Sequence, residues 1–250
     1  MKQQLPTISP DSFDAVLFDL DGVLTQTAKV HAQCWQIMFD EFLQDYSQKQ
    51  QISFRAFDPI QDYRLYVDGK PRYEGVQSFL ESRDIHLPYG DIKDPEDRET
   101  ICGLGNRKDR LVKAAIDRGE VETYATSITL VRQLREKGVQ TAVVSSSRNC
   151  EAILKSVGID DLFSLRVDGV VAAEKKIPGK PKPDTFLKAA EILKVSPDRA
   201  VVVEDAIAGV QAGRDGKFGL VIGVDRTGDA DALRENGADV VVQDLGEFLH

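Results

Sequence analysis

Two carboxylates stand at the end of a short apolar run near the start of the chain. In AVLFDLDGVLTQT (residues 15–27), Asp19 and Asp21 lie two positions apart, and Gly22 follows at once. Two like charges at the end of a buried strand carry a desolvation cost that a simple turn would not offset. A turn closed by Gly22 is the plain alternative. The pair nevertheless favours a site whose chemistry uses both carboxylates.

Polar clusters also mark three later points of the chain. They are the serine run Ser145-Ser146-Ser147, Lys180 within GKPKPD (179–184), and the acidic pair Glu204-Asp205. The serine run and the acidic pair end apolar runs, and Lys180 precedes a helix-like segment. Ligands of an open α/β sheet bind outside the carboxyl ends of its strands. We therefore expect carboxylates, hydroxyls and a lysine to converge at one edge of a sheet.

Each cluster also has an ordinary structural explanation. The serine run can cap a helix at 148–157, and Glu204-Asp205 can cap a helix that starts at 206. Lys180 can be an ordinary loop lysine. Taken singly, these alternatives stay open. Four such clusters, three of them at predicted strand ends, are much harder to explain in this way together.

Phosphoryl transfer through an aspartyl phosphate uses this set of groups. One carboxylate attacks phosphorus, and a second one nearby serves as general acid and base for the leaving and entering oxygens. A hard divalent cation with oxygen ligands offsets the crowded negative charge. A hydroxyl and an ammonium then hold the phosphoryl oxygens.

Short runs rich in valine and isoleucine predict buried parallel strands. They cover residues 15–21, 141–146, 200–206, 220–225 and 239–245. Helix-like segments separate the later runs, at 127–138, 149–158 and 183–195. This alternation predicts an α/β fold with a doubly wound parallel sheet, a Rossmann-like core.

The alternation is interrupted between the first two strand runs. Three amphipathic helix-like segments lie there, at 28–46, 73–85 and 107–119, with no apolar strand run among them. We therefore predict an inserted helical cap domain. The expected division is an N-terminal tail (1–12), a core (13–27 and 120–250) and the cap (28–119).

Composition and charge narrow the class of partner. The 250 residues are 42% hydrophobic and 29% charged, with a formal net charge of −9, which argues against nucleic acid as the main partner. The three cysteines are far apart in the sequence, and this sparse, odd number is typical of proteins in a reducing compartment.

No apolar run suits a signal peptide or reaches the roughly 20 residues of a membrane span. We expect a cytoplasmic monomer with no membrane partner.

The four clusters, in this order, resemble the motifs of the haloacid dehalogenase superfamily of phosphotransferases. DLDGV (19–23), Ser145, Lys180 and EDA (204–206) match its first to fourth motifs, and the resemblance covers nearly the whole chain. It implies that Asp19 is the nucleophile and that Asp21 is the general acid and base.

The same resemblance implies a metal site and a phosphate site. The residues expected to hold Mg²⁺ are Asp19, Asp21 through its backbone carbonyl, Asp205 and, close by, Glu204. Those expected to bind the transferring phosphoryl group are Ser145, Ser146, Asn149 and Lys180.

A finer resemblance is to the β-phosphoglucomutase group. TQTAKVHAQCW (25–35) is similar to the hinge segment of that group, and Arg72 falls where a cap arginine grips the non-transferring phosphate. The residues placed at the substrate or in the cap are Thr27, His31, Trp35, Arg72, Lys108 and Ser147. The departures are a longer cap segment at 45–66, Gln26 in place of an acidic residue, and Gly75 in place of a serine.

The cap residues have ordinary explanations as well. His31 and Trp35 can simply pack inside the cap, and Arg72 can be a solvated arginine. Lys108 fits either description. For Arg72, the glycine-flanked stretch GKPRYEG suits a loop that descends on a ligand.

The resemblance leaves three hypotheses for the function. The first is a β-phosphoglucomutase that interconverts β-D-glucose 1-phosphate and glucose 6-phosphate through an aspartyl phosphate and a bisphosphate intermediate. The second is a phosphatase of sugar or polyol phosphates on the same scaffold. The third, a non-catalytic binding domain, is disfavoured by the complete set of motif residues. A small phosphorylated sugar is the expected ligand.

Overall fold

The structure is a computed structural model that describes residues 5–226 and 228–249. The chain divides into two compact units. The first, which we call the core, contains residues 1–26 and 122–250, and the second, which we call the cap, contains residues 27–121. The chain therefore leaves the core after Gln26 and returns to it at Glu122.

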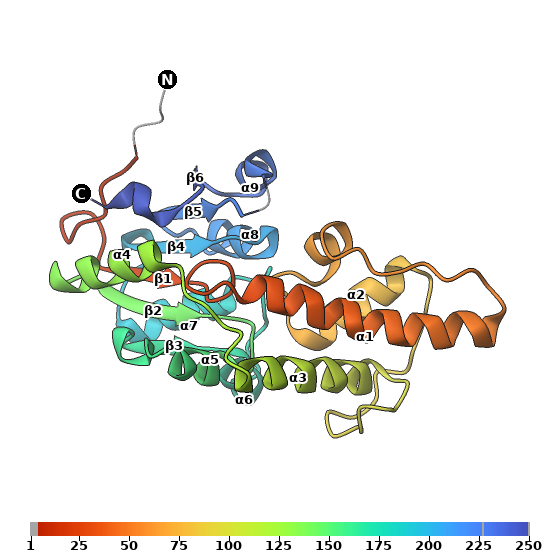
Figure 1. The fold of residues 1–250 in the computed structure, drawn as a ribbon. Coiled ribbons are helices and arrows are strands. Elements are labelled where there is room, and N and C mark those ends of the chain that lie inside the picture. The colour runs from red at the N-terminus through yellow and green to blue at the C-terminus, as the bar shows by residue number, and fades with distance from the viewer. Residues whose placement is uncertain (1–4, 227, 250) are drawn as a thin grey trace. The chain divides into compact units, whose positions relative to one another are not determined.

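The core is built on one six-stranded sheet whose neighbouring strands all pair in parallel. The order across the sheet is β3-β2-β1-β4-β5-β6, so the chain starts in the middle, runs to one edge and then crosses to the other half (Figure 1). The strands are β1 Ala15–Phe18, β2 Gln140–Val144, β3 Leu165–Val167, β4 Ala200–Glu204, β5 Leu220–Val224 and β6 Val240–Val242. The predicted doubly wound α/β fold is confirmed.

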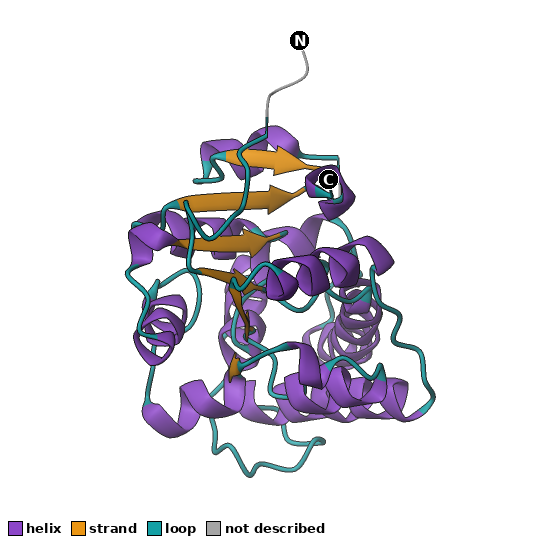
Figure 2. Ribbon diagram, turned by 90° about the vertical axis from the view of Figure 1, so that its left-hand side faces the viewer, coloured by secondary structure: helices purple, strands orange, loops and turns teal. Residues whose placement is uncertain are grey.

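Helices cover both faces of this sheet (Figure 2). They are α4 Ala125–Glu136, α5 Cys150–Ser156, α6 Gly169–Lys175, α7 Asp184–Leu193, α8 Ile207–Asp215 and α9 Ala230–Glu235, with the 3-10 turns η2 Asp160–Leu162, η3 Pro197–Arg199 and η4 Leu245–Phe248. Leu17 and Val202 of the sheet form one buried cluster with Phe186 of α7 and Val210 of α8. Cover on both faces explains why the strands are continuous valine-rich runs.

Strand β3, at one edge of the sheet, was missed by the sequence patterns. It has three residues, and the central one is Arg166. The guanidinium of Arg166 donates to Asp168 at 2.6 Å and to Glu151 at 2.9 Å. A short edge strand with a charged centre contains no apolar run, so periodicity does not detect it.

Part of the expected N-terminal tail is attached to the core. Residues 1–4 of it lie outside the described residues. Ile8 is 6% exposed, and the Arg199 guanidinium donates to the carbonyl oxygens of Pro10 at 2.9 Å and Asp11 at 3.2 Å. Residues 8–11 therefore pack on the core, where the sequence suggested only a tail.

The cap is helical and has an aromatic interior. It contains α1 Thr27–Gln50, the π-helix η1 Tyr63–Val67, α2 Arg72–Ser82 and α3 Ile101–Asp117. The ring of Phe39 lies 5.3 Å from that of Trp35, 5.2 Å from that of Phe57 and 4.1 Å from that of Phe79, between centroids. All four side chains are buried, so the cap has a hydrophobic core of its own.

Helix α3 begins at Ile101, several residues before the expected segment at 107–119. Thr100 caps it, because its Oγ1 accepts from the N–H of Gly103 at 2.9 Å. Glycines are weak helix formers, so Gly103 and Gly105 hid this first turn from the sequence patterns. Gly105 lies against the ring of Tyr73, where a Cβ would collide with it.

The segment 45–66, which lengthens the cap, consists of the end of α1, a stretch without regular secondary structure and the start of η1. The N–H of Phe57 donates to the carboxylate of Asp40 on α1 at 2.7 Å. Arg83, at the end of α2, donates to Asp62 at 2.6 Å. These bonds hold the added segment against α1 and α2.

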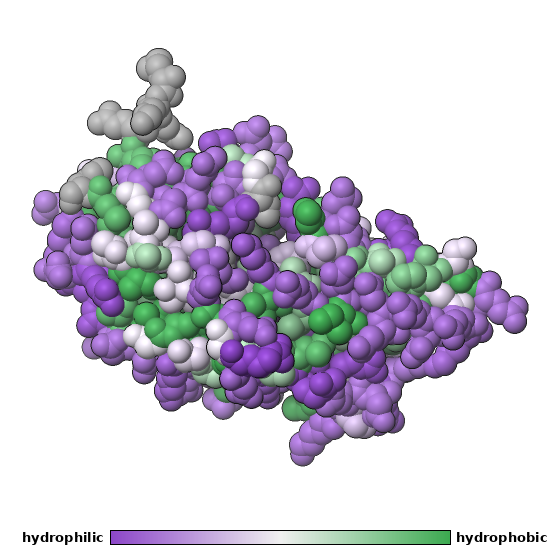
Figure 3. Space-filling view, in the orientation of Figure 1, coloured by the Kyte–Doolittle hydropathy of each residue, from purple (hydrophilic) through white to green (hydrophobic). Residues whose placement is uncertain are grey.

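No helix in the described ranges is long and apolar enough to cross a membrane. On the face shown in Figure 3, hydrophilic residues predominate, and hydrophobic areas lie between them. Large exposed apolar side chains include Ile52, Phe54 and Ile60 of the cap. Some exposed apolar side chains are ordinary on the surface of a folded protein.

Removing the Phe39 ring should destabilise the protein strongly. The side chain is fully buried against three other rings, so Phe39→Ala loses apolar contacts and leaves a cavity. In urea denaturation we expect the free energy of unfolding to fall by about 3–5 kcal/mol. The control is Ile60→Ala, at a side chain that is 71% exposed. It should change this free energy by less than about 0.5 kcal/mol, and a similar small change for Phe39→Ala would contradict the packing.

Candidate functional site

The register of the parallel strands places Asp19 beside the acidic pair. Phe18, the last residue of β1, is paired with Val143 of β2 and Val203 of β4. The N–H of Asp19 still donates to the carbonyl oxygen of Val203, at 2.9 Å. Glu204 ends β4 one residue after Val203. The carboxyl ends of β1, β2 and β4 therefore form one edge at which three of the polar clusters meet.

Lys180 reaches the same edge from the loop before α7. Its ammonium donates to Asp19 Oδ1 at 2.5 Å and to the carbonyl oxygen of Val144 at 3.0 Å, and it forms an ion pair with Glu204. Its Nζ lies 5.0 Å from the centre of the Phe186 ring. The residue is 1% exposed. Lys180 is thus a buried counter-charge and not an ordinary loop lysine.

Burial and neighbouring charges set the protonation of this group. Burial raises the pKa of Asp19 well above its usual range, the ammonium of Lys180 opposes this rise, and the charges of Glu204 and Asp21 add to it. Burial alone would lower the pKa of Lys180, but the carboxylates of Asp19 and Glu204 outweigh burial and raise it. Lys180 therefore stays charged. A further cation beside the carboxylates would favour the ionised form of Asp19.

Two glycines give the acidic pair the space that it needs. A Cβ on Gly209 of α8 would overlap the carboxylate of Glu204. Gly22 has a φ of +81°, and a Cβ on it would overlap the carboxylate of Asp205. The N–H of Ala206 donates to the carboxylate of Glu204 over a long 3.4 Å, and the N-cap of α8 makes no side-chain bond. Glu204 is therefore positioned mainly by its ion pair with Lys180 and not by helix capping.

Three carboxylates form a group that suits a hard divalent cation. Oxygens of Asp19, Glu204 and Asp205 lie within 4.8 Å of one another. Carboxylate oxygens are preferred ligands of Mg²⁺, and three carboxylates set against the one ammonium of Lys180 leave an excess of negative charge. Asp21, which is expected to contribute its backbone carbonyl, is not part of this group of side chains.

The serine run shapes the loop between β2 and α5. Ser145 is 2% exposed, and its Oγ accepts from the N–H of Ser147 at 3.0 Å. The Oγ of Ser147 accepts in turn from the N–H of Asn149 at 3.2 Å. These bonds order the loop before α5. Helix α5 itself has no side-chain cap, so the capping alternative is not supported. Asn149 is buried and Ser146 is half-buried.

Three of the expected cap residues lie together. The Nζ of Lys108 lies 2.5 Å from Nδ1 of His31 and 4.7 Å from the centre of the Trp35 ring. Lys108 and His31 are 6% and 8% exposed. Which of the two nitrogens donates depends on the tautomer of the imidazole. His31 and Trp35 therefore pack around the buried end of Lys108.

Arg72 begins α2 and is fixed by residues that the sequence analysis missed. Its Nη1 forms an ion pair with Asp109 at 2.5 Å, and its Nη2 donates to the hydroxyl of Tyr73 at 3.2 Å. That hydroxyl donates to Asn106 at 2.8 Å. A signal was present, because positions 106 and 109 share one face of a helix. Nothing in the sequence spacing links that face to α2. Asp109 and Tyr73 thus fix the side chain of Arg72, which is not freely solvated.

The expected site residues fall into two groups, one in each unit. The core contains Asp19, Asp21, Ser145, Ser146, Ser147, Asn149, Lys180, Glu204 and Asp205, and the cap contains Thr27, His31, Trp35, Arg72 and Lys108. Thr27 is the first residue of α1 and is 1% exposed. Gly75, one of the departures, lies beside the ring of Trp35.

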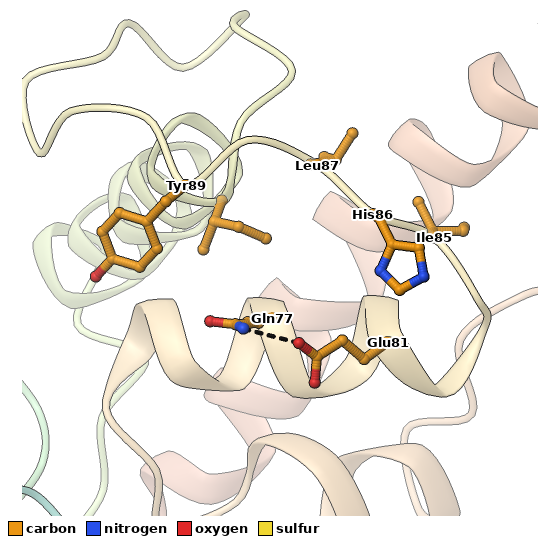
Figure 4. A pocket seen from close by; sticks show the side chains of 7 residues that line it. Gln77, Glu81, Ile85, His86, Leu87 and Tyr89 are labelled. Atoms are coloured by element: carbon orange, nitrogen blue, oxygen red, sulfur yellow. Dashed lines mark hydrogen bonds between the residues drawn. The ribbon is translucent and has the colours of Figure 1, made fainter.

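A cavity of about 200 Å³ also lies in the cap. It is lined by Gln77, Glu81, Ile85, His86, Leu87, Tyr89 and Ile101 (Figure 4). Gln77 and Glu81 bind each other, with Nε2 of Gln77 donating at 2.7 Å. None of these residues belongs to the predicted clusters, so the cavity is not part of the candidate site.

A family model for haloacid dehalogenase-like hydrolases matches residues 13–217. The chain belongs to this family. The resemblance found in the four motifs is thereby confirmed.

Two relatives and one solved structure define the similarity further. A β-phosphoglucomutase of Mycobacterium bovis is 47% identical over 243 residues, which cover 96% of this chain and 93% of that protein. A trehalose-phosphate phosphatase of Mycobacterium leprae is 44% identical over 128 residues, which cover 50% of this chain and 28% of that protein. A β-phosphoglucomutase structure from Clostridium difficile, at 24% identity, has a TM-score of 0.73 over 94% of this chain and 92% of that one. The chain is an enzyme of this haloacid dehalogenase-like family and resembles β-phosphoglucomutases over nearly its whole length.

Mg²⁺ should raise the melting temperature of the protein. A cation that binds the folded state alone stabilises it by about 2.7 kcal/mol at a hundredfold excess over Kd. For a chain of this size that corresponds to a rise of about 5–10 °C, measured by differential scanning fluorimetry. Asp205→Asn removes one carboxylate of the group and should cut the shift by more than half. Asp160→Asn, at an exposed carboxylate, is the control and should keep it. Equal shifts in both variants would contradict a cation site at Asp205.

Proposed function

We propose that this protein transfers phosphoryl groups through an aspartyl phosphate on Asp19. The observation that carries the proposal is the buried group in which Lys180 binds Asp19 beside the acidic pair. A carboxylate oxygen of Asp19 attacks phosphorus, and the bond from phosphorus to the leaving oxygen breaks. Asp21 protonates that oxygen as general acid and later accepts the proton of the incoming hydroxyl as general base.

The other core residues are proposed to bind the group being transferred. The residues assigned to its oxygens are Ser145, Ser146, Asn149 and Lys180. Mg²⁺ would be held by Asp19, Asp205 and the backbone carbonyl of Asp21, with Glu204 close by. When bound, it would supply positive charge opposite the phosphoryl oxygens. The ammonium of Lys180, which binds Asp19 in the structure, would then share its charge between nucleophile and phosphate.

Within this chemistry we propose β-phosphoglucomutase activity, the interconversion of β-D-glucose 1-phosphate and glucose 6-phosphate through a bisphosphate intermediate. Similarity to a β-phosphoglucomutase along almost the full length of both proteins supports this substrate. The reaction needs a second phosphate-binding group, and it needs water kept from the aspartyl phosphate while the bisphosphate reorients. We assign the first task to Arg72 and the second to closure of the cap.

The remaining cap residues are assigned by the same resemblance. His31 is proposed to set the timing of proton transfer by Asp21. Lys108, which binds His31 at 2.5 Å, is proposed to face the sugar, as are Thr27 and Ser147. Trp35 is assigned to packing beside Lys108, 4.7 Å from its Nζ.

A phosphatase of sugar or polyol phosphates is the alternative. The partial similarity to a trehalose-phosphate phosphatase, 44% over 128 residues, favours it. The chemistry at Asp19 would begin in the same way. It would end with water, activated by Asp21, attacking the aspartyl phosphate. Access of water to Asp19 therefore separates the two functions.

The products distinguish the mutase from the phosphatase. With Mg²⁺, β-glucose 1-phosphate and a trace of glucose 1,6-bisphosphate, we expect rapid formation of glucose 6-phosphate and little inorganic phosphate, since the proposed closure of the cap would exclude water. Both products are followed in the same reaction. Release of inorganic phosphate without isomerisation would contradict the mutase and identify the phosphatase.

Two cap arginines serve as matched variants in this assay. Arg72→Ala removes the proposed second phosphate group and should slow formation of glucose 6-phosphate by about two orders of magnitude, while the aspartyl phosphate still forms. Arg110→Ala, which removes only a surface ion pair to Glu96, should leave the rate unchanged. Full isomerisation by Arg72→Ala would refute the role given to Arg72 and leave the chemistry at Asp19 standing.

A further inference from the structure

Arg226 binds the loop that carries Asp21, although it lies outside the four motif clusters. It follows β5, and its Nε donates to the carbonyl oxygen of Gly22 at 2.7 Å. Its Nη1 donates to the carbonyl oxygen of Gln243 at 3.0 Å. The side chain is 17% exposed, so water competes little for these bonds.

The loop around Asp21 is held by backbone bonds on both sides of that residue. Before it, the carbonyl oxygen of Leu20 accepts from the N–H of Thr25 at 3.0 Å. After it, the N–H of Gly22 donates to the carbonyl oxygen of Thr25 at 2.8 Å. The carbonyl of Gly22 is the group that Arg226 binds. The residue next to Asp21 is therefore fixed at its N–H by the loop and at its carbonyl by a side chain from another strand end.

Arg226 also rests on the segment that returns from the cap. Its Cζ lies 3.6 Å from the centre of the Tyr124 ring, within the range of a cation–π contact. The N–H of Tyr124 donates to the carbonyl oxygen of Leu24 at 3.0 Å, and the N–H of Gln26 donates to that of Glu122 at 2.8 Å. The outgoing and returning chain thus form a short ladder, and Arg226 contacts both sides of it.

The turn that presents Arg226 is itself well ordered. The N–H of Asp225 donates to the carbonyl oxygen of Val242 at 2.8 Å. The Oδ1 of Asp225 accepts from the N–H groups of Gly228 at 2.7 Å and Asp229 at 2.9 Å. Arg226 is therefore presented from a defined position, and the bond that it makes restrains the loop.

We propose that Arg226 is a positioning residue for Asp21, which it holds through the carbonyl of Gly22 while the ring of Tyr124 supports its guanidinium. This inference rests on the proposed function, in which Asp21 exchanges a proton with the sugar oxygen. A general acid contributes about 10²–10⁴-fold when it is held within hydrogen-bond reach of that oxygen. Arg226 itself touches no reacting atom. Its loss should therefore slow the steps that need the acid and spare those that do not.

Two phosphoryl donors that differ in their need for an acid provide the test. Acetyl phosphate releases acetate, which departs without protonation, whereas glucose 1,6-bisphosphate releases a sugar oxygen that must take up a proton. The rate of Asp19 phosphorylation from each donor is measured with Mg²⁺ in the full-length protein. Arg226→Met should lose about tenfold or more with the bisphosphate and less than about threefold with acetyl phosphate.

Three further variants control this comparison. Arg226→Lys keeps a charge and a donor and should recover part of the bisphosphate rate. Tyr124→Leu removes the ring beside the guanidinium and should show the same donor-dependent loss, which keeps the test intact if Arg226→Met does not fold. Arg199→Met removes another arginine that binds backbone carbonyls and a carboxylate, that of Asp14, and should change neither rate.

Equal losses with both donors in Arg226→Met and Tyr124→Leu, or no loss in either, would overturn the inference. Asp21→Ala separates this failure from failure of the proposed function. If Asp21→Ala loses only the bisphosphate reaction while Arg226→Met loses nothing, the positioning role alone is refuted. If Asp21→Ala is itself insensitive to the donor, the role of Asp21 is refuted and the inference about Arg226 with it.

Discussion

The buried ammonium of Lys180 is the charge on which the core site depends. It binds Asp19 and Glu204 at the ends of two neighbouring strands, where both carboxylates are removed from water. Removing one partner of a buried ion pair typically costs about 3–5 kcal/mol, because the remaining charge is left uncompensated. A buried ion pair is weak evidence for stability as such. The arrangement fits the proposed function, in which the carboxyl group of Asp19 attacks phosphorus and Lys180 offsets negative charge beside it.

Space constrains the site as much as charge does. The carboxylates of Glu204 and Asp205 occupy positions that a Cβ on Gly209 or Gly22 would fill. The parallel register then fixes how far Asp19 stands from the end of β4. The backbone at Gly209 and Gly22 therefore lies in direct contact with these two carboxylates. A side chain added at either glycine would displace the carboxylate beside it. The site is thus part of the packing of the sheet and its helices.

Much of the core site could be predicted from the sequence, for a physical reason. A parallel sheet brings the carboxyl ends of its strands to one edge whatever its other details, so polar clusters after apolar runs must meet there. The order of the motifs then indicated the family, and the roles of Asp19, Asp21 and Lys180 are proposed from the same resemblance. Strand β3 could not be predicted, because the central Arg166 interrupts its apolar run. The first turn of α3 could not be predicted either, because two glycines lie in that part of the helix.

The contacts that hold the proposed site residues and their loops could not be predicted either. Arg72 is bound by Asp109 from another helix, and Gly22 by Arg226 from a distant strand end. Such pairs have no periodicity in the sequence, and only tertiary packing brings them together. Motif residues can therefore be identified from a single sequence. The residues that position them can be identified only from the folded structure.

Chemical identification of the phosphorylated residue tests the central claim most directly. The protein is incubated with Mg²⁺ and acetyl phosphate, quenched in acid and treated with borohydride, which reduces an aspartyl phosphate to homoserine. Peptide mass spectrometry then locates the converted residue. We predict conversion at Asp19, none at Asp21, and none in Asp19→Asn. Conversion at another residue, or undiminished conversion in Asp19→Asn, would contradict Asp19 as the nucleophile and the phosphoryl-transfer function built on it.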